Sequence, residues 1–316
     1  MTAARVRGIP TVVTMHDFWW FCGRQFLVER DLHPCSIVAK AGVCPCEVGA
    51  VWRERREVGL SAHLQMADVV LAPSGSLAEA LIANGVHPAR IRVDENGMPG
   101  AERMVDAWQG PSDRGDGVVR FLFAGGPHPL KGIGVLLDAA RRLRSVPGWS
   151  IDLYGFNDAD DLSVPSGLPI RVHPGYPAER TAEIMHGHDV LVLPSLARES
   201  YSLICREALL AGLPVITSDT PGPMEVVRDG ENGLVVPAGD VEALAGALRS
   251  LTEDDALRKR LTPAPGSCPL RSVEQQAADL EVLYDELQGT ATRLPRERSG
   301  DLRHVLFVVG IEGAPL

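Results

Sequence analysis

Glu199 and Glu207 stand eight positions apart in the segment ESYSLICRE, where an apolar run gives way to a helical pattern. Eight residues are a little over two helical turns, so the two carboxylates can bind different parts of one ligand. The turn after Glu199 opens a helix whose free backbone N–H groups favour an anion. Glu207 lies within the helix, where a carboxylate can accept two hydrogen bonds from a cis-diol such as a ribose. This arrangement suits a sugar nucleotide, although an isolated pair at this spacing is more often two solvated glutamates.

Two other loops carry residues that could do chemistry. Gly125 and Gly126 follow the run VRFLF and let the backbone approach a ligand closely, and Lys131 adds one ammonium for phosphate charge. His16 and Asp17 follow the run TVVTM. Ligands of doubly wound sheets bind where the strands end and helix N-termini converge, so the loops after strands are the expected places for a site.

The elements that would position these loops follow an α/β pattern. Short β-branched runs alternate with longer amphipathic stretches, as in βαβ units around a parallel sheet. We expect strands over residues 11–15, 69–72, 91–94, 119–123, 151–154, 170–173, 190–193, 214–217 and 233–236. We expect helices over residues 52–66, 76–83, 135–144, 178–186, 203–211, 241–251 and 273–287. Ser76 is the expected N-cap of the second helix, with Glu79 at the capping-box distance.

Composition limits the class of protein. The 316 residues are 45% hydrophobic and 23% charged, which is typical of a globular chain of about two domains. The 41 acidic residues outnumber the 31 basic ones, so the net charge of −10 argues against a nucleic-acid partner. No apolar run approaches the roughly 18 residues of a spanning helix, and the first one ends at His16. We therefore expect a cytoplasmic protein.

The motifs together carry a family resemblance. The stretch from Gly125 to Pro237 contains GG-x4-KG, DVLVLPS, E-x7-E, AGLPVI, GPMEVV and GENGLVV in this order. It resembles the donor-binding domain of family 4 glycosyltransferases of the GT-B fold, which has two Rossmann-like doubly wound domains. IPTVVTMHDFWWFC looks like the family's strand and loop with a cleft histidine, and IRVDENGMPG looks like the strand that leads into its hinge.

The resemblance implies a role for each matching residue. Glu199 would bind the donor sugar and Glu207 the ribose, while Lys131 would hold the pyrophosphate and His16 would approach the transferred sugar. The implied donor-binding set is Gly125, Gly126, Lys131, Glu199, Ser200, Tyr201, Ser202, Leu203 and Glu207, and the implied catalytic set is His16, Lys131 and Glu199. Many relatives have an arginine at the position of Gly126, so the cationic clamp lacks one charge here.

The implied reaction moves a sugar from a UDP- or GDP-sugar to an acceptor with retention of configuration. It needs no protein nucleophile, no metal and no cofactor, because the leaving phosphate oxygen can take the acceptor proton. The acceptor stays open between a glycan, a lipid-linked molecule and a small molecule. Two alternatives remain: a nucleotide-sugar epimerase on the same fold, or a nucleotide-sugar-binding module that is catalytically incomplete.

The resemblance also divides the chain. Breakers concentrate between Asn96 and Gly117, where the hinge is expected. Residues 1–98 would be an incomplete N-terminal acceptor-side domain with a cysteine-rich insertion, because few strands precede the hinge. Residues 99–271 would be the donor-binding domain. We expect a helix over 272–288 that returns toward the first domain, and then a linker and a further strand within 289–316.

Four cysteines, Cys22, Cys35, Cys44 and Cys46, fall close together. Thiolate tetrads bind zinc, so the sequence predicts either a structural zinc or free thiols at this place. The basic run from Arg53 to Arg56 is interrupted by Glu54 and is most simply a solvated helix face. Contact with a membrane surface, which some relatives use, stays open.

Overall fold

The computed structural model describes residues 1–29, 31–39, 50–106, 115–157, 160, 162–264, 267–268 and 271–290. The chain forms two compact units. Unit 1 contains residues 1–31, 35–96 and the chain from residue 274 onward, and unit 2 contains residues 32–34 and 97–273. Within unit 2, the segment that follows Asn96 lies beside the segment that precedes Glu274, because the Met98 N–H donates to the Arg271 carbonyl at 2.9 Å.

Unit 1 is built on a three-stranded parallel sheet with the order β1-β2-β3 in the described residues. Its strands are β1 (Val12–Thr14), β2 (Val69–Ala72) and β3 (Ile91–Val93). Its helices are α1 (Thr2–Val6), α2 (Ala50–Met66), α3 (Gly75–Ala83), the 3-10 turn η1 (Pro88–Arg90) and α11 (Val273–Thr290). The strand β2 is apolar throughout because both faces are covered.

The two faces of β2 pack against segments far apart in sequence. Val70 and Ala72 lie in one core with Leu77 and Leu81 of α3. Val69 and Leu71 lie in a second core with Leu283 of α11. The last described helix therefore completes the sheet at the start of the chain.

Unit 2 is built on six parallel strands in the order β6-β5-β4-β7-β8-β9. These strands are β4 (Val119–Ala124), β5 (Trp149–Tyr154), β6 (Ile170–His173), β7 (Val190–Leu193), β8 (Val215–Ser218) and β9 (Gly233–Val236). Counted from β4, this is the strand order 3-2-1-4-5-6 of a Rossmann domain. The order reverses between β4 and β7, whose loops carry most of the motif residues.

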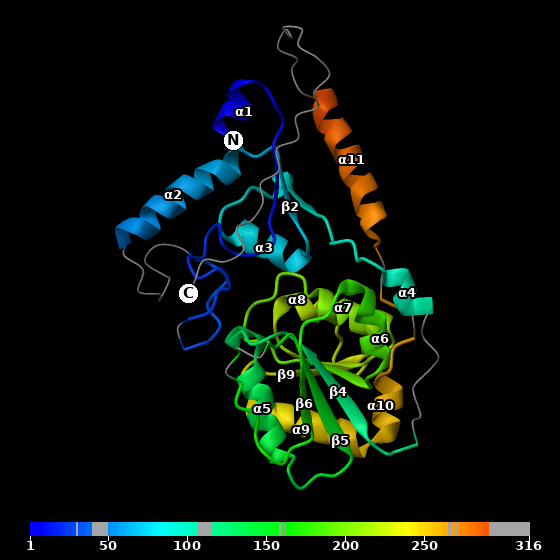
Figure 1. Ribbon diagram of the computed structural model, residues 1–316. Coiled ribbons are helices and arrows are strands. Elements are labelled where there is room, and N and C mark those ends of the chain that lie inside the picture. The colour runs from blue at the N-terminus through cyan, green and yellow to red at the C-terminus, as the bar shows by residue number, and fades with distance from the viewer. Residues whose placement is uncertain are drawn as a thin grey trace. The chain divides into compact units, whose positions relative to one another are not determined.

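Helices cover both faces of this sheet (Figure 1). One core joins the sheet to α5 (Ile133–Arg142), α9 (Val241–Glu253) and α10 (Asp255–Leu261). The other joins it to α4 (Ala101–Asp106), α6 (Thr181–His186) and α7 (Leu203–Leu210). The remaining elements are α8 (Pro221–Met224) and the 3-10 turns η2 (Pro129–Lys131) and η3 (Ala178–Arg180).

Several sequence expectations need correction. The N-cap of α3 is Ser74, not Ser76, because the Ser74 hydroxyl accepts a hydrogen bond from the Leu77 N–H at 3.1 Å. The region expected as a loop hinge contains α4, since Met104 is buried against α6 and α7 and this packing outweighs the local breakers. The helix expected over 178–186 is a 3-10 turn followed by α6. The strand expected within 304–313 lies outside the described residues.

Candidate functional site

The candidate site lies at the point where the strand order of unit 2 reverses. The loop of residues 125–132 follows β4, and the loop of residues 194–202 follows β7. The two strands are neighbours in the sheet, so their carboxyl ends bring the two loops together. Each loop runs into a helix, α5 or α7, whose N-terminus is oriented toward this edge of the sheet.

Backbone contacts tie the two loops to each other. The Leu130 carbonyl accepts hydrogen bonds from the Leu196 N–H at 2.8 Å and from the Ser195 hydroxyl at 3.2 Å. Gly132 has a φ of +78° and sits against Pro194, where a Cβ would lie 1.8 Å from the Pro194 carbonyl oxygen. Only glycine fits there, so the glycine of the KG pair serves this contact between the loops.

Lys131 and Glu199 form an ion pair across the two loops. The Lys131 Nζ lies 2.8 Å from Glu199 Oε1, and the Ser195 hydroxyl donates to the same oxygen at 2.9 Å. The Glu199 side chain is 14% exposed and the Lys131 side chain 38% exposed. The ammonium is therefore held at one place while part of its surface still faces solvent, where an anion can reach it.

The N-terminus of α7 adds further donors beside this pair. Among the residues that the structure describes, no acceptor is bonded to the backbone N–H of Leu203 or Ile204, and the Ser202 side chain does not cap the helix. The first N–H groups of a helix carry partial positive charge and bind anions when no cap satisfies them. Lys131 and this helix end together offer a site for a phosphate group.

Glu207 lies one to two turns further along α7 and is largely buried. Burial raises the pKa of this carboxyl above its usual value. Burial, together with the charge of Glu207 and of Tyr154, also raises the pKa of Tyr176 to about 12. In the described part of the chain no hydrogen bond satisfies the Glu207 carboxylate. An acceptor of this kind is suited to a ligand with adjacent hydroxyls.

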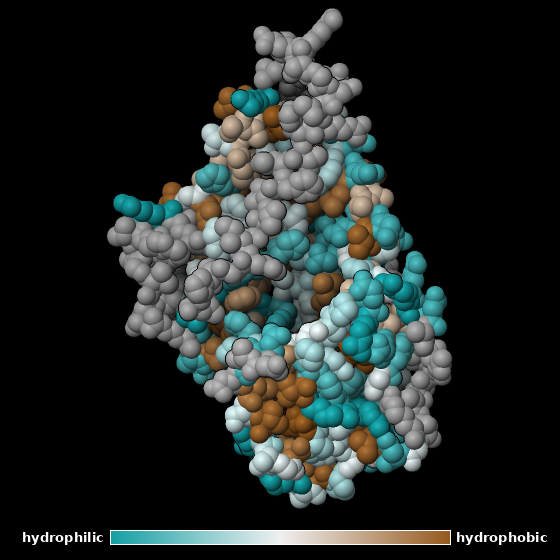
Figure 2. Space-filling model, viewed as in Figure 1, coloured by the Kyte–Doolittle hydropathy of each residue, from teal (hydrophilic) through white to brown (hydrophobic). Residues whose placement is uncertain are grey.

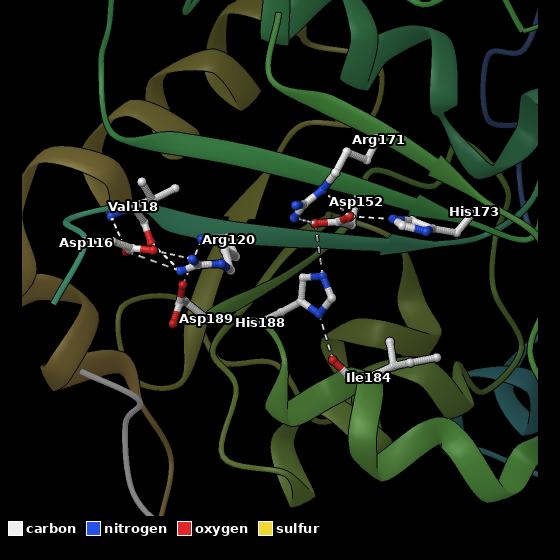
Figure 3. Close-up of polar contacts among 9 residues, drawn as sticks. All are labelled: Asp116, Val118, Arg120, Asp152, Arg171, His173, Ile184, His188 and Asp189. Atoms are coloured by element: carbon white, nitrogen blue, oxygen red, sulfur yellow. Dashed lines mark hydrogen bonds and ion pairs between the residues drawn. The ribbon is translucent and has the colours of Figure 1, made fainter. Parts of the chain in front are cut away.

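A cluster of charged residues is centred on the buried Asp152 in β5 (Figure 3). Arg171 donates to the Asp152 carboxylate at 2.9 and 2.6 Å, and His173 Nε2 lies 2.5 Å from Oδ1. His188 Nε2 lies 3.4 Å from Oδ2. Burial by itself raises the pKa of Asp152, but the contacts with His188, Arg171 and His173 outweigh it and hold the pKa well below its usual range.

Aromatic contacts connect this cluster to the surroundings of Glu207. The Tyr154 ring stacks on His173 at 4.4 Å between centroids and meets Tyr176 edge-on at 5.4 Å. Tyr176 is the residue whose pKa the Glu207 charge influences. Sequence reasoning missed this group. The one available signal was an aspartate in the middle of the apolar strand Trp149–Tyr154, where an unpaired charge would be costly.

His16 belongs to unit 1, where it follows β1 and is exposed. The adjacent Asp17 organises its loop, because its carboxylate accepts hydrogen bonds from the Trp19 N–H at 2.7 Å and from the Gln25 side chain at 2.5 Å. The other residues of the predicted catalytic and donor-binding sets all belong to unit 2. The structure therefore brings Lys131 together with Glu199 and places Glu207 on the helix that follows.

Comparison with known proteins supports the resemblance. Residues 119–254 match the family model described as glycosyl transferases group 1. Over this region the chain is similar to the family 4 glycosyltransferases. The motif resemblance is thus confirmed, and the matched residues include both loops of the candidate site.

Individual relatives match different parts of this chain. The phosphatidyl-myo-inositol mannosyltransferase of Mycobacterium leprae is 38% identical over 141 residues, 43% of this chain and 38% of its own length. The D-inositol 3-phosphate glycosyltransferase of Nocardia farcinica is 29% identical over 78% of this chain and 60% of its own length. The chain therefore spans less than two thirds of the length of these relatives.

The solved structure of Anabaena HepE in complex with UDP shares the fold. It is 20% identical, with a TM-score of 0.66 over 90% of this chain and 74% of its own. The expected α/β, Rossmann-like GT-B fold is confirmed. Doubly wound sheets of this class bind ligands where the strand order reverses, which in unit 2 lies between β4 and β7.

Gly126 shows why the cationic clamp lacks the arginine of many relatives. Its φ is +67°, and a Cβ would lie 3.2 Å from the Gly155 carbonyl oxygen. Gly155 has a φ of +96°, and a Cβ on it would lie 3.1 Å from Gly126. The two backbones approach so closely that a side chain at either position would strain the loop. An arginine at position 126 would therefore strain this close contact.

Zinc binding by the four cysteines stays a prediction. Cys22 is buried and Cys35 is half-buried in unit 1, whereas Cys44 and Cys46 lie outside the described residues. Within the described residues no three metal-binding side chains converge. We expect one zinc per chain in freshly purified protein and its loss in Cys44→Ser, measured by elemental analysis. Cys268→Ser in unit 2 is the control, and zinc-free parent protein would contradict the prediction.

No helix in the described ranges is both long and apolar enough to cross a membrane. Figure 2 shows hydrophilic and hydrophobic residues interspersed on the face that it displays. The larger exposed apolar side chains are distributed over both units, as with Trp19, Val58, Val172 and Met224. Scattered exposed apolar residues are normal for a protein surface.

Proposed function

We propose that this chain binds a nucleoside diphosphate sugar in unit 2 and transfers the sugar to an acceptor. The observation that carries the proposal is the anion site at the strand-order reversal, where Lys131 and the uncapped N-terminus of α7 offer positive charge side by side. Glu199 lies next to this charge and Glu207 follows on the same helix. A ligand with a diphosphate between two sets of hydroxyls matches this order of groups.

The related proteins support the donor class. Solved structures of HepE contain UDP and UDP-glucose, and the curated relatives are named as mannosyl- and inositol phosphate glycosyltransferases. We propose a UDP- or GDP-sugar as the donor of this chain. The acceptor is a glycan, a lipid-linked molecule or a small molecule, and the buried residues of unit 2 do not discriminate among them.

The chemistry that these residues supply is electrostatic and geometric. In the proposed reaction the bond between the anomeric carbon and the phosphate oxygen breaks, and the acceptor oxygen bonds to that carbon on the same face. Because the new bond forms on the same face, the configuration of that carbon is retained. The acceptor proton passes to the departing phosphate oxygen, so no protein base is required. Negative charge grows on the diphosphate as it leaves, and Lys131 with the helix N–H groups stabilises it. His16 is assigned a positioning role.

A panel of UDP- and GDP-sugars tests the function directly. Transfer or slow hydrolysis of one of them, detected as release of UDP or GDP, would support an enzyme. Binding of the nucleotide without any turnover would favour the binding-module alternative, and interconversion of two sugars on the nucleotide would favour an epimerase. Absence of binding for every member of the panel would reject the proposal.

The role of Glu207 yields a prediction with two opposite effects. We expect Glu207→Gln to weaken binding of UDP or GDP by about 10- to 100-fold, since hydrogen bonds to a charged group contribute roughly 1.5–3 kcal/mol. We also expect the variant to be more stable than the parent at neutral pH. Burial raises the pKa of Glu207 in the folded protein. Ionisation of this carboxyl therefore opposes folding once the pH exceeds the usual pKa of a glutamate, and glutamine removes that cost.

Calorimetric titration of each nucleotide and thermal unfolding at pH 7.5 measure the two effects. Glu253→Gln is the matched control, because Glu253 is exposed near the end of α9. Equal nucleotide affinity in Glu207→Gln and the parent would remove the ribose assignment. A loss of affinity that comes with a loss of stability would mean that the substitution disturbs α7 as a whole.

A further inference from the structure

The turn that carries Glu199 into α7 adopts an unfavourable backbone conformation. Ser202 has a φ of +61° and a ψ of +78°, in the left-handed region that favours glycine. A residue with a side chain stays in this region only when its surroundings hold it there. The same turn sets the direction of the Leu203 and Ile204 N–H groups, so whatever holds it also determines the proposed anion site.

Arg206 lies one helical turn into α7 and contacts the segment that precedes Ser202. Its side chain is only 3% exposed. One terminal nitrogen donates a hydrogen bond to the Tyr201 carbonyl, and the guanidinium carbon lies 3.5 Å from the centroid of the Tyr201 ring. The guanidinium therefore binds both the backbone and the side chain of the residue before Ser202. A lysine could not make the planar stacking and the hydrogen bond in the same way.

The helix α8 supports the turn from another side. The Gly222 N–H donates to the Glu199 carbonyl at 3.1 Å, and a Cβ on Gly222 would lie 2.5 Å from that oxygen and 2.9 Å from the Tyr201 nitrogen. Glu225, which follows α8, places Oε2 3.7 Å from the Arg206 guanidinium. Arg206 thus joins the turn, α7 and the end of α8.

We propose that Arg206 is a positioning residue for the donor site, which holds the turn of residues 199–203 in the conformation that binds the diphosphate. This inference rests on the proposed function. Arg206 touches neither the donor nor the reacting atoms in this scheme, and it acts through Tyr201 and the Ser202 backbone. Its neighbour Glu207 faces the ribose, so the two adjacent residues serve the two parts of the nucleotide.

The test exploits the strain at Ser202. Arg206→Met keeps an unbranched stem like that of arginine and removes the charge and hydrogen bonds of the guanidinium, and we expect it to weaken UDP binding roughly ten-fold or more. UMP, which lacks the second phosphate, should lose much less affinity. Ser202→Gly adopts the same φ without strain, so in the Arg206→Met background we expect it to recover about three-fold or more of the lost UDP affinity. Ser202→Gly in the parent background completes the cycle, and the recovery is the difference between its effects in the two backgrounds.

Titration calorimetry with UDP and UMP, and with GDP and GMP in parallel, measures all four proteins well below their unfolding temperatures. If Arg206→Met does not fold, Arg206→Lys takes its place in the same cycle with the same criteria. Unchanged UDP affinity in the arginine variant, or no recovery in the double variant, would show that Arg206 serves packing only and would overturn the inference. Failure of the parent to bind any of these nucleotides would instead reject the proposed function.

Discussion

Replacing Lys131 by methionine is expected to lower kcat/KM for sugar transfer by about 100- to 1000-fold, the usual effect of removing one preorganised group from a site of developing charge. Lys131 is the ammonium that the structure places at the strand-order reversal, 2.8 Å from Glu199 and partly open to solvent. Its interaction grows as charge moves onto the departing diphosphate. The loss should therefore be larger in kcat than in the affinity for UDP or GDP.

Steady-state kinetics with the donor that the panel identifies, together with calorimetry of the free nucleotide, separates these two quantities. Lys259→Met is the control, because Lys259 lies on α10 with a side chain that is 67% exposed. Methionine at position 131 leaves the Ser195 hydroxyl as a remaining partner of Glu199, so the variant is expected to fold. A kcat/KM within five-fold of the parent would exclude Lys131 from stabilising the leaving group.

The second large effect concerns stability. Asp152→Asn is expected to destabilise unit 2 by about 3 kcal/mol at pH 7, toward the lower end for breaking a buried ion pair because the partner Arg171 is itself 60% exposed. The asparagine keeps the shape but loses the charge that faces Arg171, His173 and His188. Both nitrogens of His188 face acceptors, Asp152 Oδ2 at 3.4 Å and the Ile184 carbonyl at 2.6 Å.

The destabilisation should depend on pH in a defined direction. The pKa of Asp152 is held below its usual value of 3.8, so its contribution to stability is present above about pH 4 and is lost as pH falls toward the folded-state pKa. Denaturant unfolding at pH 7 and at pH 3.5 measures the difference between variant and parent, which should shrink at the lower pH. Asp255→Asn, in an exposed pair on α10, should change stability far less than Asp152→Asn does. A constant difference at both pH values would contradict the charge explanation.

The two predictions differ in how far the sequence could have led to them. Lys131, Glu199 and Glu207 stand in recognisable spacing at the ends of predicted strands, because loops at these ends bind ligands in any doubly wound sheet. Asp152 has no such spacing. Its partners Arg171, His173 and His188 come from a neighbouring strand and from the turn after α6, and only the sheet register makes them meet. Arg206 is similar, since its contact with Tyr201 depends on how α7 begins.

Local sequence signals predicted most helices and strands correctly and failed where tertiary packing determined the secondary structure. The apolar runs of β2 and β7 were predicted with their observed bounds, because a strand buried on both faces must be apolar throughout. Ser76 was expected to cap α3, but the helix starts two residues earlier at a serine with free access to the Leu77 N–H. The helix α4 was missed because the burial of Met104 stabilises six residues in a region of breakers.

By itself the sequence determined the α/β class, the family resemblance and the candidate site residues of the two loops after β4 and β7, since these depend on periodicity and on side chains close together along the chain. Only the tertiary structure decided that Gly126 and Gly155 are too close for an arginine, and that Arg206 supports the strained Ser202 turn. It also showed a buried aspartate paired across strands. These features arise from contacts between segments far apart in sequence, and packing, not local preference, sets which atoms meet.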